Sequence, residues 1–136
     1  MNNSIRELEY IYKDYPFKDI TDKIISSAIE VHSMLGPGLL EDVYEEAISH
    51  EFDIRKIKYL RQHGIKLKYK NKDIENRRID FLVENQIILE LKASEGINKI
   101  YEAQVLTYLK ASSKRIGLLI NFNVERLKDG IKRLIL

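Results

Sequence analysis

A hairpin in the middle of the chain constrains its fold more than any other segment. Residues 77–83 and 87–92 read as two β-strands joined by a polar turn at residues 84–86. The second strand is apolar except at Glu90 and Lys92, and a nearly continuous apolar run is typical of a strand covered on both faces. The sequence therefore predicts a hairpin built into a covered β-sheet.

Three charged side chains interrupt this apolar hairpin. Glu90 and Lys92 are two residues apart, so both project from one face of their strand. A turn centred on Asn85 sets Asp80 opposite Glu90, with Cβ atoms roughly 4.5–5.5 Å apart. A two-residue turn instead shifts the register by one and sends Asp80 to the other face. We therefore expect an odd-length turn or a bulge, and two carboxylates that share one site.

Charges in such a strand are costly unless they are paired, hydrogen-bonded or bound to a metal. Two carboxylates beside a lysine suit a hard dication such as Mg²⁺, which prefers oxygen ligands and often takes only one or two protein carboxylates. Lys92 would then orient or deprotonate a water, or stabilise negative charge. The alternative is a cross-strand ion pair in which Lys92 or Arg78 neutralises one of the acids. The three residues alone leave both interpretations open.

Length and composition exclude several function classes. The 136 residues fit one domain. The chain has no cysteine and three scattered histidines, which excludes disulfides, thiolate catalysis and cysteine-ligated zinc or iron–sulfur sites. No run of eighteen apolar residues and no apolar leader occurs, so we expect a cytoplasmic protein without a membrane partner.

The net charge of +2 is small but unevenly distributed. Residues 55–78 contain ten basic residues and two acids. Within them, Lys66, Lys68 and Lys70 alternate with apolar residues, so a strand at residues 64–70 would present a row of lysines on one face. Such a row can contact the phosphate backbone of a nucleic acid, or it can protect an edge strand against aggregation.

The first twenty residues carry several tyrosines among charges, and either a short helix or an extension ordered by a partner fits them. Two helices are expected next, one from Thr21 or Asp22 to Leu35 and one from about Leu39 to Ile54. Strands follow at 58–62, 64–70, 77–83 and 87–92, with a turn at 71–73. The rest is expected to form a helix at about 97–111, a strand at 115–122, and a tail after Val124 that is helix or strand. This order predicts an N-terminal extension at residues 1–20 and one α/β (α+β) domain at residues 21–136, with a mixed sheet flanked by helices.

The second helix carries an acid beside its apolar face. Glu41 and Tyr44 lie three residues apart and so share one face. An acid in the first turn is also explained by the helix dipole, which is worth about 0.3–1 kcal/mol. The positions expected on the buried side of this helix are Leu40, Val43, Tyr44, Ala47, Ile48 and Phe52.

The third helix has a glutamine on an apparent packing stripe. Tyr101, Gln104 and Tyr108 step by three and four residues along one face. A glutamine in that position needs hydrogen-bond partners. Gln104 either bonds a neighbouring backbone group or reaches a metal-bound water or a phosphate, and Tyr108 could add a hydroxyl there.

Together these segments resemble the GxxExxY protein family, over about residues 20–136. The matching blocks are Gly38, Glu41 and Tyr44 of the name-giving motif, Arg78-Ile-Asp80-Phe-Leu-Val, Ile88-Leu-Glu90-Leu-Lys92-Ala, Ala103-Gln104-Val-Leu-Thr-Tyr108 and Leu118-Leu-Ile-Asn121-Phe122. The family belongs to the PD-(D/E)xK nuclease-like superfamily. The resemblance implies a restriction-endonuclease-like core, with a central mixed sheet and metal ligands from the two middle strands.

The resemblance also implies roles for individual residues. Asp80 and Glu90 match the metal-binding acids, Glu41 matches the helical acid that completes the site in many members, and all three belong to the implied catalytic set. Lys92 matches the catalytic lysine. Ile79 stands where the superfamily pattern has proline, which is a loosely kept position.

Gln104 and Tyr108 match the Gln-xxx-Tyr element of the lambda-exonuclease-like and RecB-like branches, where these residues support substrate or metal geometry. The implied activity is hydrolysis of phosphodiester bonds with Mg²⁺ or Mn²⁺, with DNA as the expected substrate. The alternative is a catalytically silent nuclease fold that binds nucleic acid or a protein. The small size favours a homodimer or a protein partner that delivers the substrate.

Overall fold

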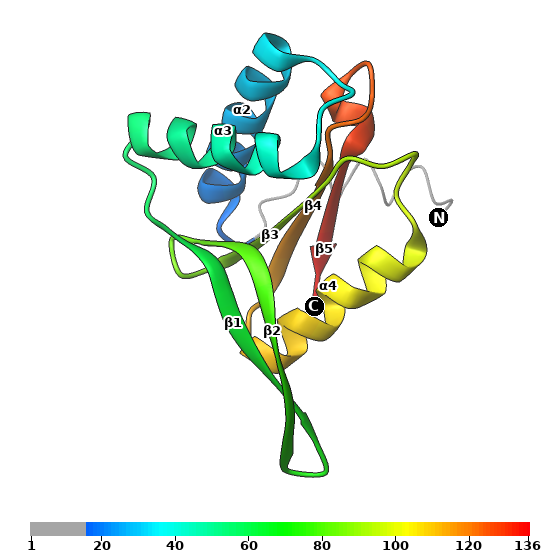
Figure 1. The fold of residues 1–136 in the computed structure, drawn as a ribbon. Coiled ribbons are helices and arrows are strands. Elements are labelled where there is room, and N and C mark those ends of the chain that lie inside the picture. Colours follow the sequence, from blue (N-terminus) through cyan, green and yellow to red (C-terminus); the bar gives the residue numbers. More distant parts are fainter. Residues whose placement is uncertain (1–15) are drawn as a thin grey trace, which may run out of the picture.

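The computed structural model describes residues 16–136, and Figure 1 shows their arrangement. Within these residues the chain forms three α-helices, one 3₁₀ helix and five strands. They follow in the order α2 (Lys18–Leu35), α3 (Glu41–Ile54), β1 (Tyr59–Tyr69), β2 (Lys72–Val83), β3 (Ile87–Lys92), α4 (Lys99–Ser112), β4 (Ile116–Asn121), η1 (Leu127–Gly130) and β5 (Ile131–Ile135). Most of the expected N-terminal extension therefore lies outside the described residues.

The strands form one mixed sheet in the spatial order β1-β2-β3-β4-β5. Strands β3 and β4 run parallel, and the other neighbouring pairs are antiparallel. A parallel pair needs a crossover connection, which α4 supplies. Helices α2 and α3 pack on one face and α4 on the other (Figure 1). This confirms the predicted fold class, a single α+β domain with a mixed sheet flanked by helices.

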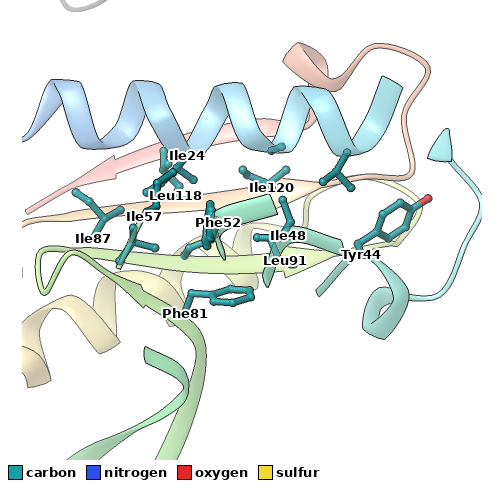
Figure 2. Close-up of a cluster of buried hydrophobic side chains, with 14 of the residues drawn as sticks. Ile24, Tyr44, Ile48, Phe52, Ile57, Phe81, Ile87, Leu91, Leu118 and Ile120 are labelled. Atoms are coloured by element: carbon teal, nitrogen blue, oxygen red, sulfur yellow. The ribbon is translucent and has the colours of Figure 1, made fainter. Parts of the chain in front are cut away.

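Two clusters of buried side chains cover the two faces of the sheet. The α2–α3 cluster, drawn in Figure 2, joins Ile24 and Phe52 from the helices to strand residues such as Phe81 and Leu118. Burying one such side chain contributes about 1.5–3 kcal/mol. The α4 cluster on the other face consists of Ile65, Ile79, Leu82, Ile88, Val105, Tyr108 and Leu109.

The turn between α2 and α3 is organised by the buried Tyr44. Its hydroxyl donates to the carbonyl of Gly36 at 2.7 Å and accepts the N–H of Leu39 at 3.1 Å. Gly36 and Gly38 adopt φ values of +71° and +94°, which glycine reaches without the strain of a side chain. The ring of Tyr44 stacks on Phe122 at 4.4 Å between centroids. The turn is therefore tied to the core through the first turn of α3, which carries Tyr44.

The second helix buries fewer residues than its pattern predicts. Tyr44, Ile48 and Phe52 are buried, but Leu40 and Val43 are 74% and 41% exposed, so the prediction was wrong for these two. Leu40 is the N-cap and has an extended backbone, so its side chain lies outside the helical face.

Element boundaries also differ from the prediction. Helix α2 begins at Lys18, before the predicted cap. The strands expected at 58–62 and 64–70 form the single strand β1, and its hairpin turns at Lys70 and Asn71, both with positive φ, instead of at 71–73. The tail forms η1 and β5. Among the described residues, no helix combines the length and apolar character that a bilayer span requires.

Candidate active site

The β2–β3 hairpin has the register that the sequence predicts. Phe81 pairs with Leu89 and Val83 with Ile87. The turn between them contains three residues, and the same register sets Asp80 opposite Glu90. The expected odd-length turn is therefore confirmed.

The regular backbone pairing of β2 and β3 ends at Phe81 and Leu89. Beyond that point, the carboxylates of Asp80 and Glu90 accept the backbone hydrogen bonds between the two strands. The N–H of Asp80 donates to Glu90 Oε1 at 3.2 Å, and the N–H of Leu91 donates to Asp80 Oδ2 at 2.8 Å. Each carboxylate therefore accepts a backbone hydrogen bond from the opposite strand. Strands β2 and β3 are held together there by the side chains of the site.

In strands β1 and β2, the side chains before and after the level of Asp80 pack on opposite faces of the sheet. Ile79 belongs to the α4 cluster, and Phe81, two residues later, belongs to the α2–α3 cluster. A regular strand would put both on one face. Asp80 lies at the change of face, which explains how it can interact with acids of α3 and with Glu90, whose face carries α4.

The two carboxyl groups lie in an environment that disfavours their charge. The pKa of Asp80 is raised to about 6, chiefly by burial and in smaller part by the charges of Glu45 and Glu41, while the Leu91 N–H opposes the rise. The pKa of Glu90 is raised to about 8, chiefly by burial and next by the charge of Asp80, while the Asp80 N–H and Lys92 oppose the rise. The site therefore has an excess of negative charge in a partly dry setting, which favours a bound cation.

Glu41 and Lys92 face the same space from α3 and β3. Although Glu41 is largely exposed, partial burial raises the pKa of its carboxyl, and the Lys92 ammonium opposes this rise. Lys92 Nζ lies 4.4 Å from the ring centroid of Tyr101 on α4, within the range of a cation–π contact. The aromatic ring therefore fixes the ammonium beside the acids.

The ion-pair interpretation does not describe the site. Among residues 16–136, no ion pair joins Asp80 or Glu90 to Lys92 or Arg78. In the same part of the chain, no three Asp, Glu or His side chains gather closely enough to hold a metal together. The donor set that fits a hard dication is the buried Glu90 together with the half-buried Asp80, and Mg²⁺ commonly takes one or two carboxylates and completes its shell with water.

The two predicted residues of α4 lie in different environments. Tyr108 is 5% exposed, and burial raises the pKa of its hydroxyl, with a further rise from Glu90. Its hydroxyl therefore lies near enough to Glu90 to be affected by that charge. Gln104 is exposed, so the expectation that it needs partners on a packing stripe was wrong. The buried stripe of α4 runs through Val105, Tyr108 and Leu109.

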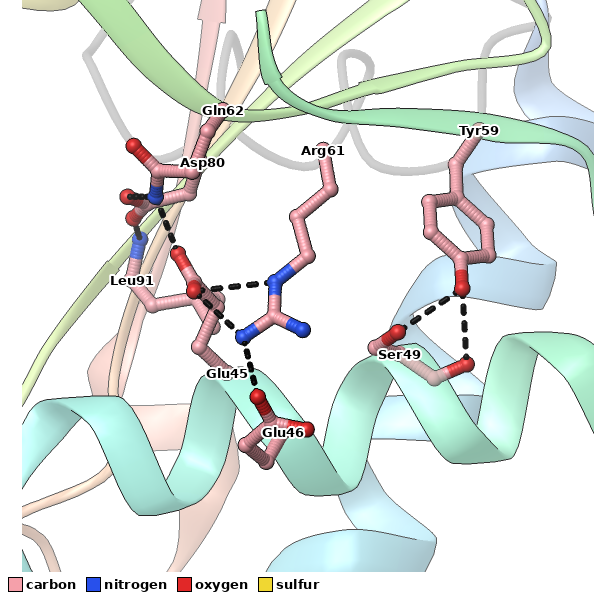
Figure 3. A network of polar contacts seen from close by, with 8 residues as sticks. All are labelled: Glu45, Glu46, Ser49, Tyr59, Arg61, Gln62, Asp80 and Leu91. Atoms are coloured by element: carbon pink, nitrogen blue, oxygen red, sulfur yellow. Dashed lines mark hydrogen bonds and ion pairs between the residues drawn. The ribbon is translucent and has the colours of Figure 1, made fainter.

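The sequence analysis missed a polar network that reaches Asp80 from β1 and α3 (Figure 3). It consists of Glu45, Arg61 and Gln62. Glu45 is four residues after Glu41 and so shares its helical face, a signal that could have found it. Gln62 lies opposite Asp80 only through the β1–β2 register, which requires the correct hairpin turn.

The predicted lysine row lies on the edge strand of the sheet and on the turn that follows it. Lys66 and Lys68 pair with Asp73 at 3.1 and 3.9 Å, and both side chains are more than half exposed. Lys70 lies in the β1–β2 turn, with Nζ 5.5 Å from the Tyr69 ring centroid. Lys66 is four strand residues beyond Gln62, which is roughly 13 Å. The row is thus separate from the acids.

Two comparisons with known proteins agree on the fold family of this chain. The family model described as "PD-(D/E)XK nuclease superfamily" matches residues 18–134. The fold is similar to the solved structure described as "Crystal structure of SSO0001", with a TM-score of 0.57 and 14% identity over 96% of this chain and 74% of that chain. At this identity the likeness shows the fold alone. No curated protein sequence matches the chain significantly.

Proposed function

Because the chain belongs to the PD-(D/E)XK nuclease superfamily, we propose that it is a nuclease that hydrolyses phosphodiester bonds, with DNA as substrate and Mg²⁺ or Mn²⁺ as cofactor. Within the superfamily we assign it to the GxxExxY family, on the motif Gly38, Glu41 and Tyr44. The observation that carries the proposal is the geometry of the half-buried Asp80 and the buried Glu90, whose carboxyl groups lie side by side and each accept a backbone N–H from the opposite strand.

Asp80 and Glu90 would hold the dication, and Glu41 would approach it from α3. The chemistry that a dication held by these acids would supply is polarisation of the scissile phosphate and neutralisation of its charge. Both acids already accept backbone N–H groups across the strands, so their carboxylates are oriented before a cation binds. Such preorganisation avoids rearrangement during the reaction.

Lys92 would orient the attacking water or stabilise the charge that develops on the phosphate. Its ammonium lies over the ring of Tyr101, so it can point toward the substrate without pairing with a carboxylate. The Tyr108 hydroxyl would support Glu90 from α4. Gln104 is exposed, so its role would be contact with substrate and not with the metal.

A cleavage panel tests the proposal directly. The wild-type chain is incubated with single- and double-stranded DNA and RNA, each with Mg²⁺, Mn²⁺ or Ca²⁺ and with EDTA. We expect Mg²⁺- or Mn²⁺-dependent cleavage that EDTA abolishes, with DNA as the preferred substrate. Binding of nucleic acid without cleavage under any metal would contradict this proposal and identify the chain as a silent binding module.

We also propose that Lys66, Lys68 and Lys70 contact the nucleic-acid backbone. Lys66 and Lys68 line a groove of about 430 Å³ between β1 and α4, together with Lys110. Exposed ion pairs contribute only about 0–1 kcal/mol, so a phosphate can displace Asp73 at little cost. The groove would therefore guide the strand along the sheet edge toward the acids.

The double substitution Lys66→Gln/Lys68→Gln should weaken nucleic-acid binding and reduce the dependence of log K on log salt by about 1.4–2, because two phosphate contacts are lost. Fluorescence anisotropy over a salt series measures both effects. Lys23→Gln on α2, an exposed position, is the matched control. An unchanged salt slope in the double variant would show that the row only protects the sheet edge.

A further inference from the structure

Gln62 holds the carboxylate of Asp80 from the neighbouring strand. Its Nε2 donates to Asp80 Oδ1 at 3.3 Å, while the N–H of Leu91 donates to Asp80 Oδ2 at 2.8 Å. Each oxygen of Asp80 therefore has one fixed donor (Figure 3). A carboxylate oxygen has two lone pairs, so one lone pair on each oxygen stays available for a cation.

The amide of Gln62 is itself fixed by an ion pair. Its Nε2 also donates to Glu45 Oε1. The other oxygen of Glu45 accepts from Arg61 Nε at 3.0 Å and from a terminal Arg61 nitrogen at 2.7 Å. The same nitrogen of Arg61 reaches Glu46 at 2.8 Å. The Glu45 side chain is only 14% exposed, whereas Gln62 and Glu46 lie on the exposed side of the network.

In this network the positive charge of Arg61 is kept away from Asp80, which suits a cation site at Asp80. The guanidinium of Arg61 is directed to Glu45 and Glu46, and a neutral amide approaches Asp80. An arginine on Asp80 would have cancelled the charge that attracts a metal. The amide orients the carboxylate and leaves its charge in place. Neutralising Glu45 also limits its repulsion of Asp80.

The backbone of Gln62 points to a site-specific role as well. Its φ of +52° lies in the left-handed region, which costs a non-glycine residue about 1–2 kcal/mol. The change of face in β1 occurs there, because Tyr59 packs on the α2–α3 cluster and Ile65 belongs to the α4 cluster. Strain of this kind concentrates at functional positions.

We propose that Gln62, fixed by Glu45 and Arg61, is a positioning residue that aims the Asp80 carboxylate at the bound dication. This inference rests on the proposed nuclease function. Gln62 does not itself ligate the metal. Residues that orient metal ligands typically contribute 10- to 100-fold to metal affinity or activity. A purely structural link between α3 and β1 would instead contribute to stability alone.

The test is Gln62→Gly, studied in the full chain with Mn²⁺ as the probe. Glycine accepts the left-handed φ, so relief of strain offsets its greater freedom in the unfolded chain. We expect the Mn²⁺ dissociation constant from calorimetry to rise about 10- to 100-fold, with a melting temperature near that of the wild type. Gln86→Ala, in the β2–β3 turn, is the matched glutamine control and should bind Mn²⁺ normally.

Gln62→Asn provides a second variant if the glycine chain does not fold. Asparagine tolerates a left-handed φ, but it is one methylene too short to bridge Glu45 and Asp80, so it should also weaken Mn²⁺ binding. Unchanged Mn²⁺ affinity in the folded variant overturns the inference, as does a loss explained by a lowered melting temperature. A wild-type chain that neither binds Mn²⁺ nor cleaves refutes the nuclease function itself. Binding and cleavage by the wild type together with normal affinity in the variant refute only the role of Gln62.

Discussion

Replacing Lys92 with alanine is expected to slow nucleic-acid cleavage by about 10²–10⁴-fold, the usual contribution of a positioned acid or base. The fold should persist, because Lys92 lies at the end of β3 and makes no ion pair among the described residues. Mn²⁺ binding should persist as well, since the ammonium is not a ligand. Single-turnover cleavage with Mg²⁺, next to Mn²⁺ calorimetry, measures the two effects separately.

Two further variants sharpen this test. Lys99→Ala removes an exposed lysine at the start of α4 and should cut at the wild-type rate. Lys92→Arg keeps the positive charge but cannot be deprotonated at neutral pH. Recovery of cleavage in Lys92→Arg would assign Lys92 to charge stabilisation, and no recovery would favour a role in proton transfer. Wild-type cleavage by Lys92→Ala would refute the assignment of the site.

The metal-free protein is expected to lose stability as the pH rises from about 4 to about 8. The folded-state pKa values of Asp80 and Glu90, about 6 and about 8, lie above their ordinary values of 3.8 and 4.5. The unfolded chain therefore releases these protons first, and the folded chain binds more protons within this window. The free energy of unfolding falls with pH wherever that holds. The total loss should be on the order of a few kcal/mol.

Urea denaturation in EDTA between pH 4 and pH 9 measures this loss. The groups that face the pair are Glu41 and Glu45 on α3, Lys92 on β3 and Tyr108 on α4. Glu90→Gln mimics the protonated acid, so its stability should fall less between pH 6 and pH 8. Saturating Mn²⁺ should stabilise the wild type most at pH 8 and the Glu90→Gln variant much less. Equal pH slopes in the two proteins would contradict the raised pKa of Glu90.

Much of the fold could be predicted because its signals are local. The three helices follow the helical period of their apolar residues, and the buried strands β3 and β4 read as apolar runs. The exposed Leu40 shows the limit, because its side chain fits the apolar face but its backbone lies outside the helix. The β1–β2 hairpin was divided wrongly, because residues 72–78 of β2 are all exposed and carry no apolar alternation, and because the left-handed Gln62 interrupts the alternation of β1.

The sequence by itself determined that Asp80 opposes Glu90 and that Glu90 and Lys92 share a face. These relations depend only on the two-residue period of a strand and on the length of one turn.

The tertiary structure alone decided that the strands part at the acids, that Gln104 faces solvent, and that Gln62 reaches Asp80. The last contact joins residues far apart in the chain through the register of the β1–β2 hairpin, the left-handed backbone at Gln62 and the packing of α3. No local pattern of side chains encodes these long-range relations.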